Sequence, residues 1–240
     1  MARFARLRRS TNRHGAVGEL DAPARITLPY LPPLEARWDN MRISAYLTRA
    51  LPERFSSDAE NLVLTLGQKP DQTIAMADSF QLHARQNEGN LDLALVARDL
   101  TVDPAFTNGT TIPPLNGEIL VTLDDGITLL GRSGSSLRGH SGTVENLHLK
   151  TSEGSAGLSI RGPVSVADNG LVDAQLQVTV DDPQAIALLV SQIFPQRRNE
   201  IGGITSGLAG LGSSPTLPVN IRQGRIFVGF LPLGNIPPLR

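Results

Sequence analysis

The residues that offer the most obvious chemistry in this chain are four histidines. They stand at His14, His83, His140 and His148. They are scattered, without the spacing of a metal site, and no cysteine is present to supply a thiolate ligand or a disulfide. We therefore expect ordinary histidines and predict no bound metal.

Two glycine-rich segments come closest to enzymatic motifs. Residues 131–135 are similar to the turn that carries a hydrolase nucleophile, but the second glycine is out of register and no α/β pattern surrounds them. Residues 207–212 have their glycines in the wrong order for a dinucleotide-binding loop and follow no strand. We interpret the first segment as a flexible loop and predict no cofactor.

Adjacent carboxylates occur twice, at Asp124-Asp125 and at Asp181-Asp182. Neighbours on a strand point to opposite faces, so neither pair is placed for general acid/base work. Turn formation and helix capping explain these residues better. The sequence therefore predicts a protein that is not an enzyme and has no catalytic residues. A hydrolase ranks third, far behind the two non-enzymatic functions given at the end of this section.

The composition limits the partners of the chain. The net charge is -1, charged residues make up 19% and aromatic residues only 4%, so we expect no nucleic-acid partner. No apolar run is long enough to span a membrane. Residues 1–20 are basic without the apolar core of a signal peptide, and we interpret them as a disordered tail without a signal or anchor. Residues 21–240 fit a single β-rich domain.

The stretch from residue 158 to residue 180 predicts a long antiparallel hairpin, because apolar residues alternate with polar ones on both sides of a turn signal. A two-residue loop would set Val166 against Asp173. A three-residue loop at residues 168–170 places Gly170 in the left-handed region and pairs apolar residues throughout. It sets Val166 against Val172, Ile160 against Val178 and Leu158 against Val180.

The elements that must position any site are mostly short strands. Alternation predicts them at residues 24–28, 36–47 (divided or bent at Asp39-Asn40), 62–66, 74–84, 91–102, 119–123, 127–129, 144–149, 219–221 and 226–230. Asp182 and Pro183 predict the start of a helix that ends before Pro195. A second helix over residues 201–211 is weakened by glycines. Gly162-Pro163 predicts a kink or bulge that curves the sheet.

This pattern predicts a mainly β fold: a large curved antiparallel sheet, or an incomplete barrel or sandwich, with one or two short helices near the C-terminus. Roughly ten strands spaced about 4.8 Å apart give a wide sheet. A helix covers about 10 Å of its width, so much of the apolar face needs another cover. We predict ligand-binding residues on this face, namely Leu158, Ile160, Val164, Val166, Leu176, Val178 and Val180.

The closing segment carries a resemblance. Residues 217–234 run as an apolar strand, a Gly224-Arg225 turn, a strand that ends at Gly229 and a Pro-Leu-Gly, with Pro-Pro-Leu at residues 237–239. Together with residues 162–172, this pattern resembles the bacterial family Domain of Unknown Function 2125 over about residues 22–240, and more loosely AsmA-like envelope proteins. The resemblance implies a β-rich protein on the periplasmic side of the inner membrane, with no known catalytic residues.

Two functions follow as hypotheses. The first is a non-enzymatic, membrane-associated module of the cell envelope whose concave apolar face contacts a lipid or another apolar ligand. The alternative is a protein-interaction or structural module of the envelope, whose sheet packs on itself and which holds no ligand. The excess of apolar sheet over helical cover favours the first hypothesis.

Overall fold

The structure is a computed structural model that describes residues 4–9, 15–26, 32–48, 51–129, 136–198, 201–203, 207, 210 and 212–239. One antiparallel sheet contains all the strands in these ranges. Its strands are β1 (Phe4–Arg9), β2 (Gly15–Leu20), β3 (Ala24–Ile26), β4 (Leu34–Arg37), β5 (Asn40–Thr48), β6 (Leu51–Leu66), β7 (Lys69–Asn87), β8 (Asn90–Val102), β9 (Leu115–Leu123), β10 (Ser141–Thr151), β11 (Gly157–Val166), β12 (Val172–Asp181), β13 (Thr216–Arg222), β14 (Arg225–Val228) and β15 (Leu231–Asn235).

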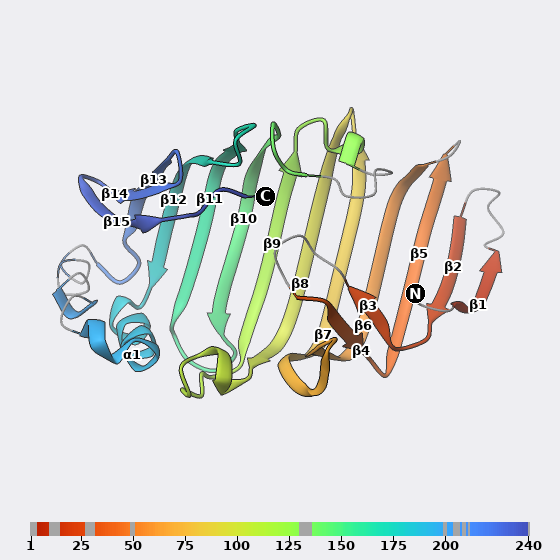
Figure 1. Cartoon of the computed structure of the whole chain (residues 1–240), viewed down its shortest axis with the longest axis horizontal. Coiled ribbons are helices and arrows are strands. Elements are labelled where there is room, and N and C mark those ends of the chain that lie inside the picture. Colours follow the sequence, from red (N-terminus) through yellow and green to blue (C-terminus); the bar gives the residue numbers. More distant parts are fainter. Residues whose placement is uncertain are drawn as a thin grey trace.

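The strands follow one another across the sheet almost in chain order. The order is β1-β2-β5-β6-β7-β8-β9-β10-β11-β12-β13-β14-β15, and the β3–β4 hairpin joins from outside this path through β4 and β6. Figure 1 shows the sheet face-on, with β3–β4 and the segment after β15 lying over it. The predicted mainly β fold with a large open antiparallel sheet is confirmed.

Helices are short. The α-helix α1 spans Pro183–Ile193, and the 3₁₀ helices are η1 (Pro104–Phe106), η2 (Gly126–Leu129) and η3 (Pro195–Arg197). As predicted, Asp182 caps α1 by accepting a hydrogen bond from the backbone N–H of Ala185, and Pro183 is the first helical residue. Hydrogen bonds from Ser155 Oγ and from the Ala185 backbone N–H hold the pKa of Asp182 below its ordinary value.

The register predicted for the central hairpin is confirmed. Val166 pairs with Val172, Ile160 with Val178, and Leu158 with Val180. The turn closes with a hydrogen bond from the Ala167 N–H to the Leu171 oxygen, and Gly170 has φ 84°. Cross-strand matching of apolar residues, a local property of the sequence, favours the three-residue loop.

The irregularity predicted at Gly162-Pro163 is present in part: the ladder with β12 is interrupted there, but the bulge lies in the neighbouring strand β10. The register between β11 and β12 is the same on both sides of these residues, although the two are not paired with β12. The register shift occurs in β10, between Val144 and Leu147, against both of its neighbours. Gly162 itself has φ 137°, so the backbone of β11 is distorted without gaining an extra residue.

Other segments differ from the prediction. Within the basic stretch interpreted as a disordered tail, the structure has β1 and β2, and β2 pairs with β5. The strand predicted at residues 127–129 is wrong, because η2 occupies that place. Asp125 there has φ 49° and its carbonyl accepts from the Thr128 N–H, which closes a helical turn. Of the second helix, Ile201 to Gly203 are helical, whereas Ile204, Leu208 and Leu211 lie outside the described residues.

Buried side chains form two small clusters at different ends of the sheet. The N-terminal cluster comprises Ala36, Trp38, Ala59 and Leu62, with Ala24 and Ile26 of β3 among the residues packed against it. The C-terminal cluster comprises Val166, Val172, Ala174 and Ile221, with Ile236 and Leu239 packed against it. The accessible surface is 15392 Å², whereas a compact monomer of this mass exposes about 10,400 Å². The chain therefore leaves far more surface open than a closed domain.

Candidate functional site

The candidate site is a row of side chains, apolar except for one serine, across the middle of one sheet face. Direct cross-strand pairs link each member to the next, from β5 to β13. Directly paired residues lie on the same face. This central row consists of Ile43, Ser57, Leu82, Leu95, Ile119, Leu147, Ile160, Val178 and Leu217.

The central row is only half-buried. All of its members except Ser57, which is buried, keep part of their surface exposed. Nine strands at a spacing of about 4.8 Å give the row a length of roughly 38 Å. No residue of the row carries a charge, so its surface is suited to an apolar ligand.

Among the described residues, the segments that cover this apolar face lie beyond the row. The β3–β4 hairpin closes over β5 and β6 at the N-terminal cluster. Residues 236–239 close over β11 and β12 at the C-terminal cluster, where the Leu239 N–H donates to the Gly170 oxygen at 2.7 Å. The Leu239 oxygen in turn accepts from Arg138 Nε at 2.8 Å. The two clusters share no residue, and the central row passes between them.

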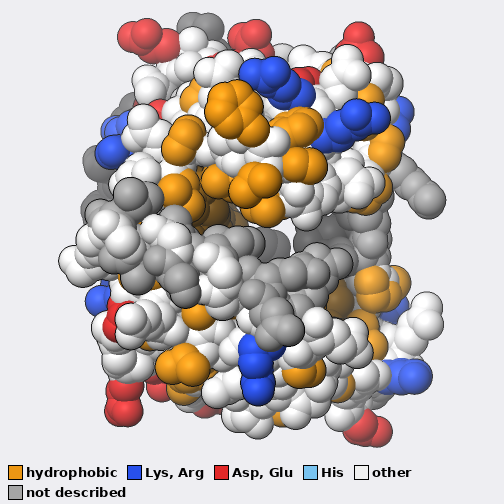
Figure 2. Space-filling model, turned by 90° about the vertical axis from the view of Figure 1, so that its left-hand side faces the viewer, with side chains coloured by type: hydrophobic (Ala, Val, Ile, Leu, Met, Phe, Trp, Pro, Cys, Tyr) orange, Lys and Arg blue, Asp and Glu red, His pale blue; other side chains and the backbone are white. Residues whose placement is uncertain are grey.

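A hollow is visible when the molecule is viewed along the sheet from the β15 end. Figure 2 shows it between the part above, which holds β13–β15, and the part below, which holds α1. Hydrophobic side chains lie on its visible walls. We call the apolar face along the central row, together with this hollow, the groove.

The seven residues predicted from the sequence all lie on this face, but in different surroundings. Val166 and Val180 are buried, with exposed fractions of 9% and 7%. Val164 and Leu176 pack against the C-terminal cluster. Leu158 is half-buried beside the row, and Ile160 and Val178 belong to it. The groove extends through β5–β10 as well, where the same alternation of apolar residues was available as a signal.

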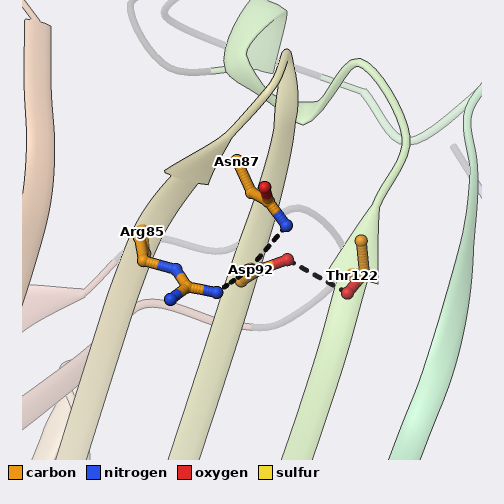
Figure 3. Close-up of polar contacts among 4 residues, drawn as sticks. All are labelled: Arg85, Asn87, Asp92 and Thr122. Carbon is orange, nitrogen blue, oxygen red and sulfur yellow. Dashed lines mark hydrogen bonds and ion pairs between the residues drawn. The ribbon is translucent and has the colours of Figure 1, made fainter.

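The opposite, outer face of the sheet is polar and carries a hydrogen-bonded cluster around Asp92. Asp92 Oδ2 accepts from Arg85 Nη2 at 2.7 Å and from Asn87 Nδ2 at 3.3 Å, and Oδ1 accepts from Thr122 Oγ1 at 3.1 Å (Figure 3). The hydrogen bond from Arg85 is the main reason that the pKa of Asp92 lies below its ordinary value of 3.8; partial burial opposes this. The cluster ties β7, β8 and β9 together, so we assign it a structural role.

Replacing Asp92 by Asn should lower the free energy of unfolding by roughly 1 kcal/mol near neutral pH. A depressed pKa means that the ionised carboxylate stabilises the fold above pH 3.8, and that this contribution is lost as the pH falls through the folded-state pKa. The difference between Asp92→Asn and the wild type should therefore shrink in acid. Urea denaturation across a pH series measures it, with Asp58→Asn, an exposed residue of the outer face, as control. A pH-independent difference would contradict the assignment.

The outer face also bears two shallow depressions. One, of 490 Å³, lies where β2, β5 and β6 meet and includes Val17, Tyr46 and Arg54. The other, of 310 Å³, spans β10–β13 and is lined by polar residues such as Asp173 and Asn220. Their linings mix charged, polar and apolar groups without a convergent set of donors or acceptors. We therefore place the candidate site on the opposite face.

Residues able to do chemistry are not brought together in the described part of the chain. His83 bonds Ser56 and His148 bonds Ser159, each at 2.9 Å, on separate strand pairs. Across the described residues no three His, Cys, Asp or Glu side chains are grouped as metal ligands. Residues 131–135 and His14 lie outside the described residues. In the described ranges, no helix is long and apolar enough to cross a membrane.

Fold and groove together define a class of protein. It is an open antiparallel β-sheet with one apolar face, which the described segments of the chain cover only in part. Comparison with family models then identifies the family. The model described as "Uncharacterized protein conserved in bacteria (DUF2125)" matches residues 14–237, and the chain belongs to this family. This confirms the family resemblance and extends it toward the N-terminus. Comparisons with curated proteins and with solved structures gave no match. The looser resemblance to AsmA-like proteins stays a prediction.

Proposed function

We propose that this protein is a non-enzymatic module of the bacterial cell envelope, on the periplasmic side of the inner membrane, that holds lipid acyl chains or a similar apolar ligand in its groove. The central row carries the proposal, because its eight half-buried apolar side chains, which share nine strands with the buried Ser57, are left without cover by the described chain. The envelope location rests on the family resemblance alone.

The energetics favour an apolar occupant. Exposed apolar patches larger than a few hundred Å² are rare on monomeric proteins unless they bind something. Covering roughly 300 Å² of the row would contribute about 7 kcal/mol before the entropy of ordering the ligand is subtracted. Only the hydroxyl of Ser57 interrupts the apolar character of the row, so a polar headgroup has no partner there and would stay at an open end.

The matched pair Ile119→Gln and Leu120→Gln tests the proposal. Ile119 lies in the central row, whereas its neighbour Leu120 points to the outer face and has an exposed fraction of 39%. Both substitutions put an amide in place of an aliphatic side chain on β9. Ile119→Gln should reduce the amount of bound lipid severalfold, because a buried amide without a partner costs about 1–3 kcal/mol. Leu120→Gln should leave it unchanged. Native mass spectrometry with lipid extraction of the purified proteins measures both.

Three outcomes are informative. Loss of ligand in Ile119→Gln alone supports the groove. Equal loss in both variants would point to general destabilisation, which the fluorescence of Trp38, the single tryptophan, reports independently. Absence of any apolar ligand from the wild type would overturn the proposal and favour the alternative, a structural or protein-interaction module of the envelope. The two clusters give that alternative its support, because they show the chain's own segments packing on the same face.

A further inference from the structure

The β15 end of the molecule presents large apolar side chains to solvent. The turn between β14 and β15 and the strand that follows expose Phe230 (102%), Leu231 (65%) and Leu233 (50%). On the α1 side of the same end, Leu188 (65%) and Phe194 (49%) are exposed. Figure 2 looks directly at this end and shows hydrophobic side chains gathered above and below the hollow. The apolar groups therefore frame one mouth of the groove.

Within the described residues, Phe230 has no packing partner that explains its position. It occupies the two-residue turn after Val228, next to Gly229, whose φ of 59° allows the tight reversal. Its side chain is fully exposed. An aromatic side chain at the tip of a protruding hairpin, followed at once by an exposed leucine, has the character of a group that enters the interfacial region of a bilayer.

The segments at this end carry basic side chains, and the nearest acidic ones, Asp173 and Asp182, lie just outside these segments. These segments, residues 183–198 and 215–239, contain neither Asp nor Glu, although the whole chain has a net charge of -1. Arg198, Arg222 and Arg225 lie in these segments and are exposed. Most acidic side chains visible in Figure 2 keep to the upper and lower margins of the view. A surface of this kind attracts anionic headgroups.

Pairing with another β-strand explains this end less well. β15 has only five residues and contains Pro232, which offers no N–H to a further strand. Short edge strands with proline are the usual protection against edge-to-edge pairing. Strand addition by a second copy also gives no role to the arginines or to the exposed groups near α1.

We propose that the β15 end docks on the surface of a bilayer that contains anionic lipids, so that the groove opens directly onto its source of apolar ligand. The docking rests on the surface described above; its role in loading the groove rests on the proposed function. Apolar side chains enter the acyl region while arginines bind lipid phosphates. The residues involved are Phe230, Leu231, Leu233, Arg198, Arg222 and Arg225.

Vesicle flotation of the full chain tests the docking. The probes are vesicles of phosphatidylcholine alone and vesicles in which about a third of the lipid is phosphatidylglycerol. The wild type should float with the anionic vesicles, and less at high salt. The double variant Phe230→Ser/Leu231→Ser should lower the partition coefficient at least tenfold. The variant Arg222→Gln/Arg225→Gln should lower it on anionic vesicles only. Leu120→Ser, an exposed apolar residue of the outer face, is the control and should bind as the wild type does.

Other results would overturn the docking. Failure of the wild type to float with either vesicle would do so, as would wild-type binding by the double serine variant. If analytical ultracentrifugation shows an oligomeric wild type and a monomeric double serine variant, the exposed apolar residues of the β15 end form a contact between copies of the chain instead. Ile119→Gln separates the two proposals: it should still float with anionic vesicles while losing its co-purified lipid. If the wild type floats with anionic vesicles but co-purifies with no lipid, the proposal of ligand binding in the groove is wrong and the proposal of membrane docking is supported.

Discussion

Gly170→Val should lower the free energy of unfolding by about 3 kcal/mol, since two effects add. Gly170 has φ 84°, a conformation that strains a β-branched residue. A Cβ at this position would also overlap the carbonyl oxygen of Leu239, and its side chain would displace residues 236–239 from the C-terminal cluster. The hydrogen bond from the Leu239 N–H to the Gly170 oxygen would be lost with them. Guanidinium denaturation followed by circular dichroism measures the loss.

Substitution of a second glycine distinguishes the cost of backbone strain from the cost of steric overlap with Leu239. Gly109 has φ 79°, almost that of Gly170, but a Cβ there would meet nothing within 4 Å. Gly109→Val should therefore cost only the backbone strain, about 1–2 kcal/mol. If both variants lose the same amount, the contact with Leu239 contributes nothing and the C-terminal segment does not depend on this turn.

The contrast between these glycines also shows what the sequence can predict. The positive φ of Gly170 and the register around it follow from a turn signal and an alternation that lie within a few residues of each other. The packing of Leu239 against that turn has no such signal, because the contact joins residues far apart in the sequence. Covers of this kind decide which part of the apolar face stays open, so the groove's extent could not be predicted.

The misinterpreted segments have similar causes. The basic residues near the N-terminus suggest a tail, yet β2 finds its partner, β5, after the β3–β4 hairpin. Residues 127–129 alternate like a strand, but Gly126 lies so close to Leu91 that a Cβ would overlap it, and the chain turns into η2 there. In both segments the structure depends on a contact with a strand that is distant in the sequence, and local periodicity cannot predict such a contact.

The sequence predicts the apolar face but underestimates its extent, and ligand binding on this face stays a prediction. Comparing the number of strands with the helical cover indicates an apolar face that needs further cover, and the described residues leave part of this face open. The seven residues named from the central hairpin mark only its C-terminal third. The central row continues because every hairpin of the sheet keeps its apolar residues in register with the next, as the pair of Leu95 with Ile119 illustrates.

Trp38→Ala should be the most damaging substitution in the N-terminal half, with a loss of about 3–5 kcal/mol in the free energy of unfolding. Trp38 has an exposed fraction of 7% and is the largest side chain of the N-terminal cluster. Its Nε1–H donates to the Leu20 oxygen at 2.9 Å, so it joins β2 to the segment between β4 and β5. Truncation would leave a cavity beneath the β3–β4 hairpin and an acceptor without its donor.

Trp38→Phe distinguishes these two contributions. Phenylalanine fills most of the cavity but cannot donate to Leu20, so this variant should lose about 1–2 kcal/mol. Circular dichroism must follow both unfolding transitions, because the substitutions remove the single tryptophan. The N-terminal cluster closes the apolar face beside β5 and β6, so Trp38→Ala should also expose more of it and increase the binding of a hydrophobic dye. A loss near zero, with unchanged dye binding, would mean that the β3–β4 hairpin is held to the sheet by its pairing with β6 and not by this core.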